Sequence, residues 1–156
     1  MTNASLASRT NQKLDTARRF IRQSQDGNEQ WLSIGLESSA IFQLRSALNG
    51  LLNEVSTAYG LSASVDVVVL ASEAEVKGIT VPVLNELIDL WKKQDSWVYQ
   101  LEQSYVVQLE SRSPLTRAID SDELIARGDD SGASASFYLV QLVELVLRFR
   151  EETSEY

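Results

Sequence analysis

The stretch NEQWLSIGLESSAIFQLRSALNGLLNEVSTAY, residues 28–59, decides the fold. Its apolar residues recur at the spacing of one face of an α-helix. They are Ile34, Ile41, Leu44, Leu48, Leu51, Leu52, Val55 and Tyr59. Gly60 follows directly, and glycine commonly ends a helix in the left-handed conformation. The sequence therefore predicts one long amphipathic helix over 28–59. Gly35 and Gly50 lie inside this helix, and glycines in such positions often mark the close approach of a neighbouring helix.

The residues before this stretch predict a second helix that packs against it. One stripe over residues 4–25 is formed by Leu6, Thr10, Leu14, Ala17 and Ile21. Asp26, Gly27 and Asn28 are residues that favour turns, and they leave only a short connection to the next helix. The helices over 4–25 and 28–59 should therefore form a hairpin.

Residues 65–70, VDVVVL, are compatible with two structures. Their β-branched side chains favour a strand. However, a lone strand has no partner for its backbone hydrogen bonds, and the sequence offers no second strand. We therefore predict a short helix over 64–77 that ends at Gly78, with a strand over 65–70 as the alternative.

The second half of the chain predicts two more long helices. Thr80-Val81-Pro82 is a typical helix start, and an apolar stripe continues to about residue 111, with a kink or break expected at Asp95-Ser96. The polar residues 112–133 predict a surface connection with one helical turn around 122–126. The apolar run 137–149 predicts a final helix over 134–152 that is surrounded on most sides.

Together these segments predict an all-α fold. Four long helices with wide apolar faces are typical of an antiparallel bundle, here with a short extra helix in the crossover. A chain of 156 residues is long enough to bury one real core, so a single helical-bundle domain is expected over 1–156.

The composition excludes several classes of chemistry. The chain has no cysteine and no histidine, which removes thiol nucleophiles, disulfides, imidazole metal sites and histidine-based triads. The dimetal sites of helical bundles use Glu-x-x-His pairs, which therefore cannot occur here. The sequence also lacks a glycine-rich phosphate-binding loop. We predict no metal, no cofactor and no enzymatic activity.

The charge distribution argues against binding to nucleic acid. The net charge is −8, which repels phosphate backbones. Residues 1–25 hold five basic residues and one acidic residue, but Arg9 and Lys13 fall on one flank of that helix and Arg18 and Arg22 on the other. We expect them to pair with acidic residues elsewhere in the chain. With no membrane-spanning segment and no export signal, a cytoplasmic location is expected.

Glu37 is the first candidate site residue. It is the only charge on the helical face that carries Ile34, Ile41 and Leu44. A lone carboxylate on a buried face is costly unless it is protonated or paired. Glu37 is therefore a candidate buried acid that lines an internal pocket; the alternatives are a polar partner on the first helix or a solvated end of the bundle.

Three aromatic residues are candidates for an interaction surface. Trp31 and Phe42 project to the same side of the 28–59 helix, away from its main stripe. Trp97 is similarly off-centre, beside Leu90 and Leu101. Each of these residues either packs against a further helix or belongs to an exposed aromatic patch that binds a partner.

These observations favour a non-enzymatic cytoplasmic protein that acts through protein–protein interaction, including self-association. The alternative is a bundle that binds or senses a small ligand, with Glu37 lining its internal pocket. A nucleic-acid partner and a membrane are both disfavoured.

Three short motifs also resemble a known family. RTNQKL at 9–14, AIFQL at 40–44 and LLNEV at 51–55 resemble a small all-helical family of unknown function from gammaproteobacteria, whose members are about this long. The resemblance covers the first 60 residues and implies a helical fold. The family has no established activity, so the resemblance assigns no functional residue.

Overall fold

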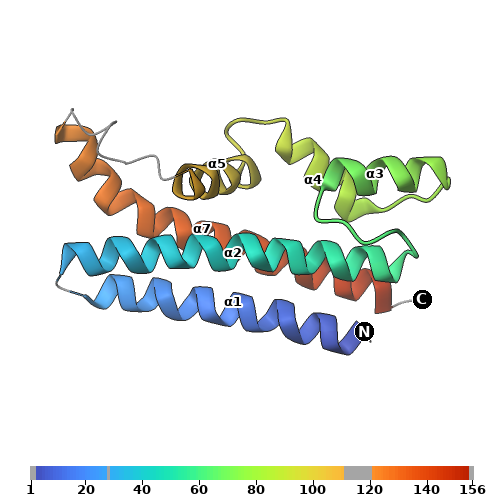
Figure 1. Cartoon of the computed structure of the whole chain (residues 1–156), viewed down its shortest axis with the longest axis horizontal. Helices are drawn as coiled ribbons and strands as arrows, with labels where there is room; N and C mark the ends of the chain where they lie inside the picture. The colour runs from blue at the N-terminus through green and yellow to red at the C-terminus, as the bar shows by residue number, and fades with distance from the viewer. Residues whose placement is uncertain (1–2, 28, 111–120, 155–156) are drawn as a thin grey trace.

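Every element that the structure describes is a helix (Figure 1). The computed structural model describes residues 3–27, 29–110 and 121–154, with residues 3 and 121–133 described by their backbone alone. The helices are α1 (Asn3–Asp26), α2 (Gln30–Ala58), α3 (Val67–Val76), α4 (Pro82–Trp91), α5 (Trp97–Leu109) and α7 (Ser121–Ser154). The predicted all-α class is thus confirmed for these residues.

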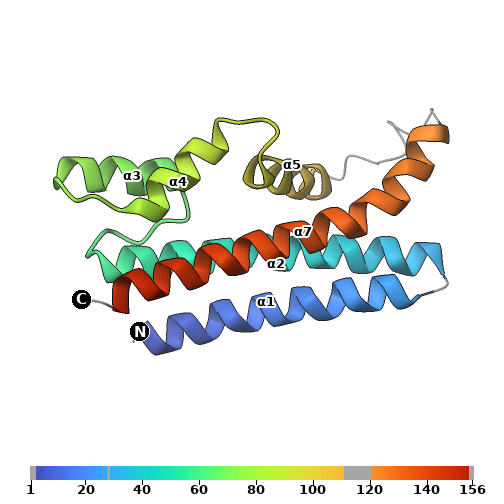
Figure 2. The same ribbon diagram turned by 180° about the vertical axis from the view of Figure 1, so that it is seen from behind.

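Three long helices, α1, α2 and α7, lie side by side in both views (Figures 1 and 2). The predicted hairpin of α1 and α2 is confirmed, and their contact is the most extensive among the helices that the structure describes. α7 runs in the same direction as α2, so that Arg150 near its end bonds to Glu54 near the end of α2. These are the directions of the first, second and fourth helices of an up-down-up-down bundle.

The expected third long helix is two shorter ones. α4 ends at Trp91 and α5 begins at Trp97, with Ser96 as its N-cap. The Ser96 hydroxyl accepts a hydrogen bond from the backbone N–H of Tyr99 at 3.1 Å and donates one to the carbonyl of Leu90. The predicted break at Asp95-Ser96 is therefore confirmed. Because of this break, the expected third long helix of the four-helix bundle is absent from the described residues. In its place the short helices α3, α4 and α5 form a layer over α2 and α7.

Residues 67–70 are helical, so the strand alternative is wrong. Asp66 caps α3 by accepting hydrogen bonds from the backbone N–H groups of Val68 and Val69, at 2.9 and 3.4 Å. Gly78, with φ of +67°, follows its end in the left-handed conformation that glycine adopts at little cost. The N-cap at Asp66 and the glycine at position 78 therefore outweigh the preference of the valines between them for a strand.

α7 begins earlier than the sequence predicts. The helical turn predicted around 122–126 is confirmed, but the surface connection expected over the rest of 121–133 is wrong, since all of these residues are helical, and residues 112–120 lie outside the described residues. Polar sequence without an apolar stripe indicated a loop. However, extending a helix that is already anchored by packing needs no new nucleation, which is the costly step. The well-packed half from Ala135 to Phe149 provides that anchor.

One hydrophobic cluster joins all six described helices. Its fully buried side chains include Leu44 and Leu51 of α2, Leu87 of α4, and Leu142 of α7. At the α1–α2 contact, a Cβ built on Gly50 would lie 2.6 Å from the hydroxyl oxygen of Thr10. The close approach predicted at this glycine is thus confirmed.

The first turns of α2 extend beyond the core. A Cβ on Gly35 would meet nothing within 4 Å, so the close approach expected there is wrong. Ile34, predicted to lie on the buried stripe, is exposed. Periodicity identified one face of the helix correctly, but neighbouring helices do not cover that face along its whole length.

Candidate functional sites

Glu37 does not occupy the buried position that the sequence predicted. Its side chain is half-buried, because it belongs to the part of α2 where Ile34, one turn away, is exposed. It does not line either of the two hollows described below. The internal pocket expected around Glu37 is therefore not among the hollows described here, and the two alternatives, a polar partner and a solvated end of the bundle, both stay predictions.

The three aromatic candidates have three different environments. Trp97 is buried in the core, so it cannot belong to an exposed patch. Phe42 packs edge-to-face on Tyr105 of α5, with ring centroids 5.3 Å apart. Trp31 is 72% exposed on the first turn of α2. The packing alternative therefore describes Trp97, whereas Phe42 stays partly exposed beside its contact with Tyr105 and Trp31 is the most exposed of the three.

Arg45, which sequence reasoning did not single out, ties α2 to the layer of short helices. Its Nε donates to a carboxylate oxygen of Glu102 at 2.6 Å, and it also bonds to Asn49. Its guanidinium carbon lies 5.7 Å from the ring centroid of Trp91 and 6.0 Å from that of Tyr105. Because all of these partners are within the protein, we interpret Arg45 as a structural clamp.

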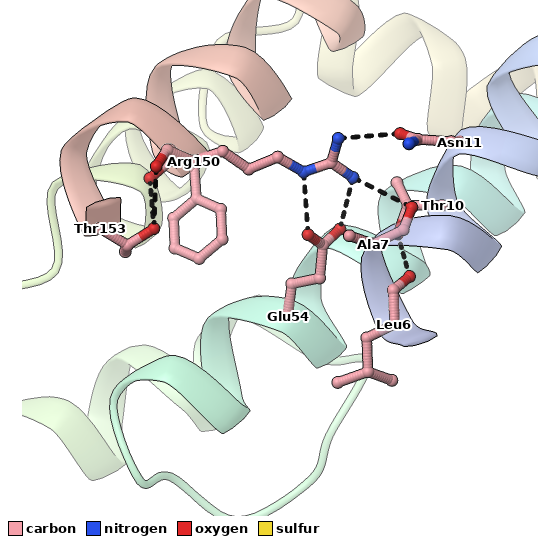
Figure 3. A network of polar contacts seen from close by, with 8 residues as sticks. Leu6, Ala7, Thr10, Asn11, Glu54, Arg150 and Thr153 are labelled. Carbon is pink, nitrogen blue, oxygen red and sulfur yellow. Dashed lines mark hydrogen bonds and ion pairs between the residues drawn. The ribbon is translucent and has the colours of Figure 1, made fainter. Parts of the chain in front are cut away.

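A second polar cluster joins α1, α2 and α7 near the C-terminal ends of α2 and α7 (Figure 3). Arg150 binds Glu54 with two N–H groups, Nε to Oε1 at 3.0 Å and an Nη to Oε2 at 3.2 Å. It also donates to the side chain of Asn11 at 2.8 Å and to the carbonyl of Ala7 at 3.2 Å. The Glu54 side chain is only 7% exposed. The guanidinium therefore satisfies a buried carboxylate and fixes the start of α1.

A hollow of about 530 Å³ opens beside this ion pair. Its wall includes Glu54, Arg150, Tyr59, Phe149 and three alanines of α1 and α2. A smaller hollow of about 340 Å³ lies where α4 meets α7, beside the pair of Arg148 and Glu86. The hydrogen bonds to Glu86 raise the pKa of the Arg148 guanidinium above its ordinary value. Both hollows are open to solvent at the surface of the bundle.

The outer face of α7 carries the largest departure from the sequence-based prediction. We expected the 137–149 segment to be surrounded on most sides. Instead Phe137, Val140 and Leu147 are each more than half exposed. They recur at spacings of three and seven, so they form one stripe, with Glu144 between them. We call Phe137, Val140 and Leu147 the α7 stripe.

α3 and Val65, which lies just before it, display a second apolar surface. Val65, Val68, Val69 and Val76 are each about half exposed or more, whereas Val67, Leu70 and Ala74 face the core. β-branched residues are not favoured on an exposed helix face, where packing does not select them. We call the four exposed valines the α3 valine face.

The basic residues of α1 do not pair as expected. Arg18 and Arg19 both contact Asp15 of the same helix, at 3.8 and 3.0 Å. Within the part of the chain that the structure describes, Arg9 and Arg22 form no ion pair. Among these residues the expected pairing with acidic groups elsewhere in the chain is therefore not seen, and α1 presents basic side chains to solvent.

The described residues show neither a metal site nor a membrane span. Among them, no group of three or more carboxylates is arranged to hold a metal ion. None of the helices in the same residues is both long and apolar enough to cross a membrane.

In the described residues these features define an all-helical protein with exposed apolar helix faces and largely buried ion pairs, Arg45 with Glu102 and Arg150 with Glu54. The chain belongs to a family of unknown function, DUF6586, which matches it over residues 1–156. No curated protein and no solved structure matches the chain.

Proposed function

We propose that this protein works by binding another protein through the α7 stripe, and that it is not an enzyme. The observation that carries the proposal is the exposure of three large apolar side chains in one line on a well-packed helix. Exposed apolar residues that occur singly are normal on a monomeric protein, whereas several on one helix face, here Phe137 and Val140 with Leu147 beyond Glu144, are typical of an interaction site. Covering a phenylalanine or leucine contributes roughly 1.5–3 kcal/mol for each fully buried side chain.

The cytoplasm of a bacterium, specifically a gammaproteobacterium, is the setting that we propose. The acidic composition and the motifs over the first 60 residues support this assignment. Fractionation of the tagged protein in its own host would test it, and recovery outside the cytoplasm would contradict it.

The test of the proposed function compares three forms of the tagged protein in its own host. The wild type, the double variant Phe137→Ser with Leu147→Ser, and a Leu109→Ser control are captured under gentle conditions. Leu109 is also an exposed apolar residue but lies on α5, away from the α7 stripe. We expect a stoichiometric protein, identified by mass spectrometry, with the wild type and the control but not with the double variant. Equal recovery with all three forms would disprove the role of the stripe.

A second candidate function is binding of a small ligand, and the hollow beside Glu54 and Arg150 favours it. Its volume of about 530 Å³ lies within the range of ligand pockets. This site replaces the pocket expected around Glu37. A thermal-shift screen against a metabolite library would test it, with Ala7→Leu as a variant that narrows the hollow. A compound that stabilises the wild type and not the variant would support this function.

A further inference from the structure

The charges around the α7 stripe restrict what can cover it. Asn11 and Gln25 of α1 face α7, because they bond to Arg150 and Ser136. Arg18 and Arg22 follow Asn11 by seven and eleven residues, so they lie on the same side of α1. Arg18 pairs with Asp15 on this side of α1, so Arg22, for which the described residues show no ion pair, is the cation that this border of the stripe offers to a partner. A surface that covers the stripe should be apolar in the middle and acidic at its edge.

One surface of this same chain has that composition. The α3 valine face is flanked by the acidic residues Asp66 and Glu75, which are exposed. Residues 61–91, which contain α3 and α4, hold five acidic residues and one lysine. α3 packs mainly on α4, at the edge of the molecule, so its outer face is accessible.

We infer that the α7 stripe of one copy of the protein is covered by the α3 valine face of a second copy. The inference rests on the proposed function and specifies its partner. Apolar side chains would meet apolar side chains, and Arg22 of α1 would meet the acidic residues beside α3. The two surfaces are different patches of the protomer, so the contact is heterologous. Such contacts build rings when the rotation closes and open chains when it does not.

Complementation between two variants of the full chain tests this arrangement. In one variant Val68→Ser and Val76→Ser remove apolar surface from α3; in the other Val140→Ser and Leu147→Ser remove it from α7. All four side chains are exposed, so the fold should be retained, as checked by circular dichroism and thermal unfolding. By sedimentation velocity, the wild type should assemble with rising concentration and each variant alone should stay monomeric. A mixture of the two should form a 1:1 dimer, because one intact α3 face meets one intact α7 stripe.

Two other results would overturn the inference. If the α3 variant assembles as the wild type does, the contact does not use α3. If the wild type is monomeric throughout, the partner is not a second copy. A monomer that still captures a different protein through the α7 stripe would leave the proposed function standing and refute only the inference.

The expected contact between Arg22 and the acidic residues beside α3 can be tested independently. Arg22→Glu should raise the concentration at which half the wild-type protein is assembled by about tenfold, which corresponds to about 1.4 kcal/mol. Lys13→Glu makes the same charge change on the opposite flank of α1 and should leave that concentration unchanged. Equal effects of both variants would show that only net charge matters and would contradict a direct contact between Arg22 and the acidic residues beside α3.

Discussion

Arg148 and Arg150 lie two residues apart on α7, and each binds a glutamate with two N–H groups. Arg148 faces outward to Glu86 of α4, and the two side chains are 60% and 37% exposed. Arg150 faces inward to Glu54 of α2, and the two side chains are 26% and 7% exposed. The chemistry of the two pairs is the same and their surroundings differ. If the exposed Arg148–Glu86 pair separates, water solvates both charges, whereas the buried carboxylate of Glu54 has no such replacement for Arg150. We therefore expect only the Arg150–Glu54 pair to be needed for the stability of the fold.

Arg150→Ala should have the largest effect. It leaves the Glu54 carboxylate buried without its cation and releases Asn11 and Ala7 of α1. Removing one partner of a buried pair costs about 3–5 kcal/mol, and we expect the lower end because Arg150 is partly exposed. Urea unfolding should show the loss. A loss no greater than that of Arg148→Ala would remove the distinction between the two pairs.

The double variant Glu54→Leu with Arg150→Met sharpens the comparison. If the cost of Arg150→Ala comes from an unpaired buried charge, replacing both partners with apolar residues should avoid it. Such replacements are often neutral, so we expect a free energy of unfolding within about 1 kcal/mol of the wild type. A double variant as unstable as Arg150→Ala would instead show that the bonds to α1 matter more than the charge.

Two glycines of α2 offer the same contrast between an inner and an outer position. Gly50→Ala gains about 1 kcal/mol of helix propensity but brings a methyl group against Thr10, and overpacking costs about 1–3 kcal/mol. We expect a net destabilisation of about 1 kcal/mol in thermal or urea unfolding. Gly35→Ala meets nothing and should stabilise by about 0.5–1 kcal/mol. Stabilisation by both substitutions would show that α1 can move away from Gly50 freely.

The sequence allowed the local elements to be predicted because their signals are local. The stripe of α2, the turn at 26–28 and the capping residue Ser96 each act within a few neighbours, and the hairpin and the break before α5 were predicted from them. The start of α7 could not be predicted this way, because the packing that anchors it lies downstream of the polar residues.

Exposure was harder to predict than secondary structure. A helical stripe shows which residues share a face, but not whether another helix covers that face. Phe137 and Ile34 are therefore exposed against expectation, and for Trp97 only the structure decides between the two alternatives, in favour of packing in the core. The pair of Glu54 and Arg150 joins residues 96 positions apart, which no local pattern reveals. The argument applied to Glu37, a single charge among buried apolar residues, would have identified Glu54.

Arg148→Ala should have the smallest effect of these changes. Exposed ion pairs contribute about 0–1 kcal/mol, because water and salt screen the charges and the long side chains lose freedom when they pair. A double-mutant cycle with Glu86→Ala, measured by urea unfolding at low and high salt, would isolate the coupling energy of the pair. We expect a small coupling that falls further as salt is added. A coupling as large as that of Glu54 and Arg150 would mean that the hollow between α4 and α7 shields its charges from water as effectively as the core does.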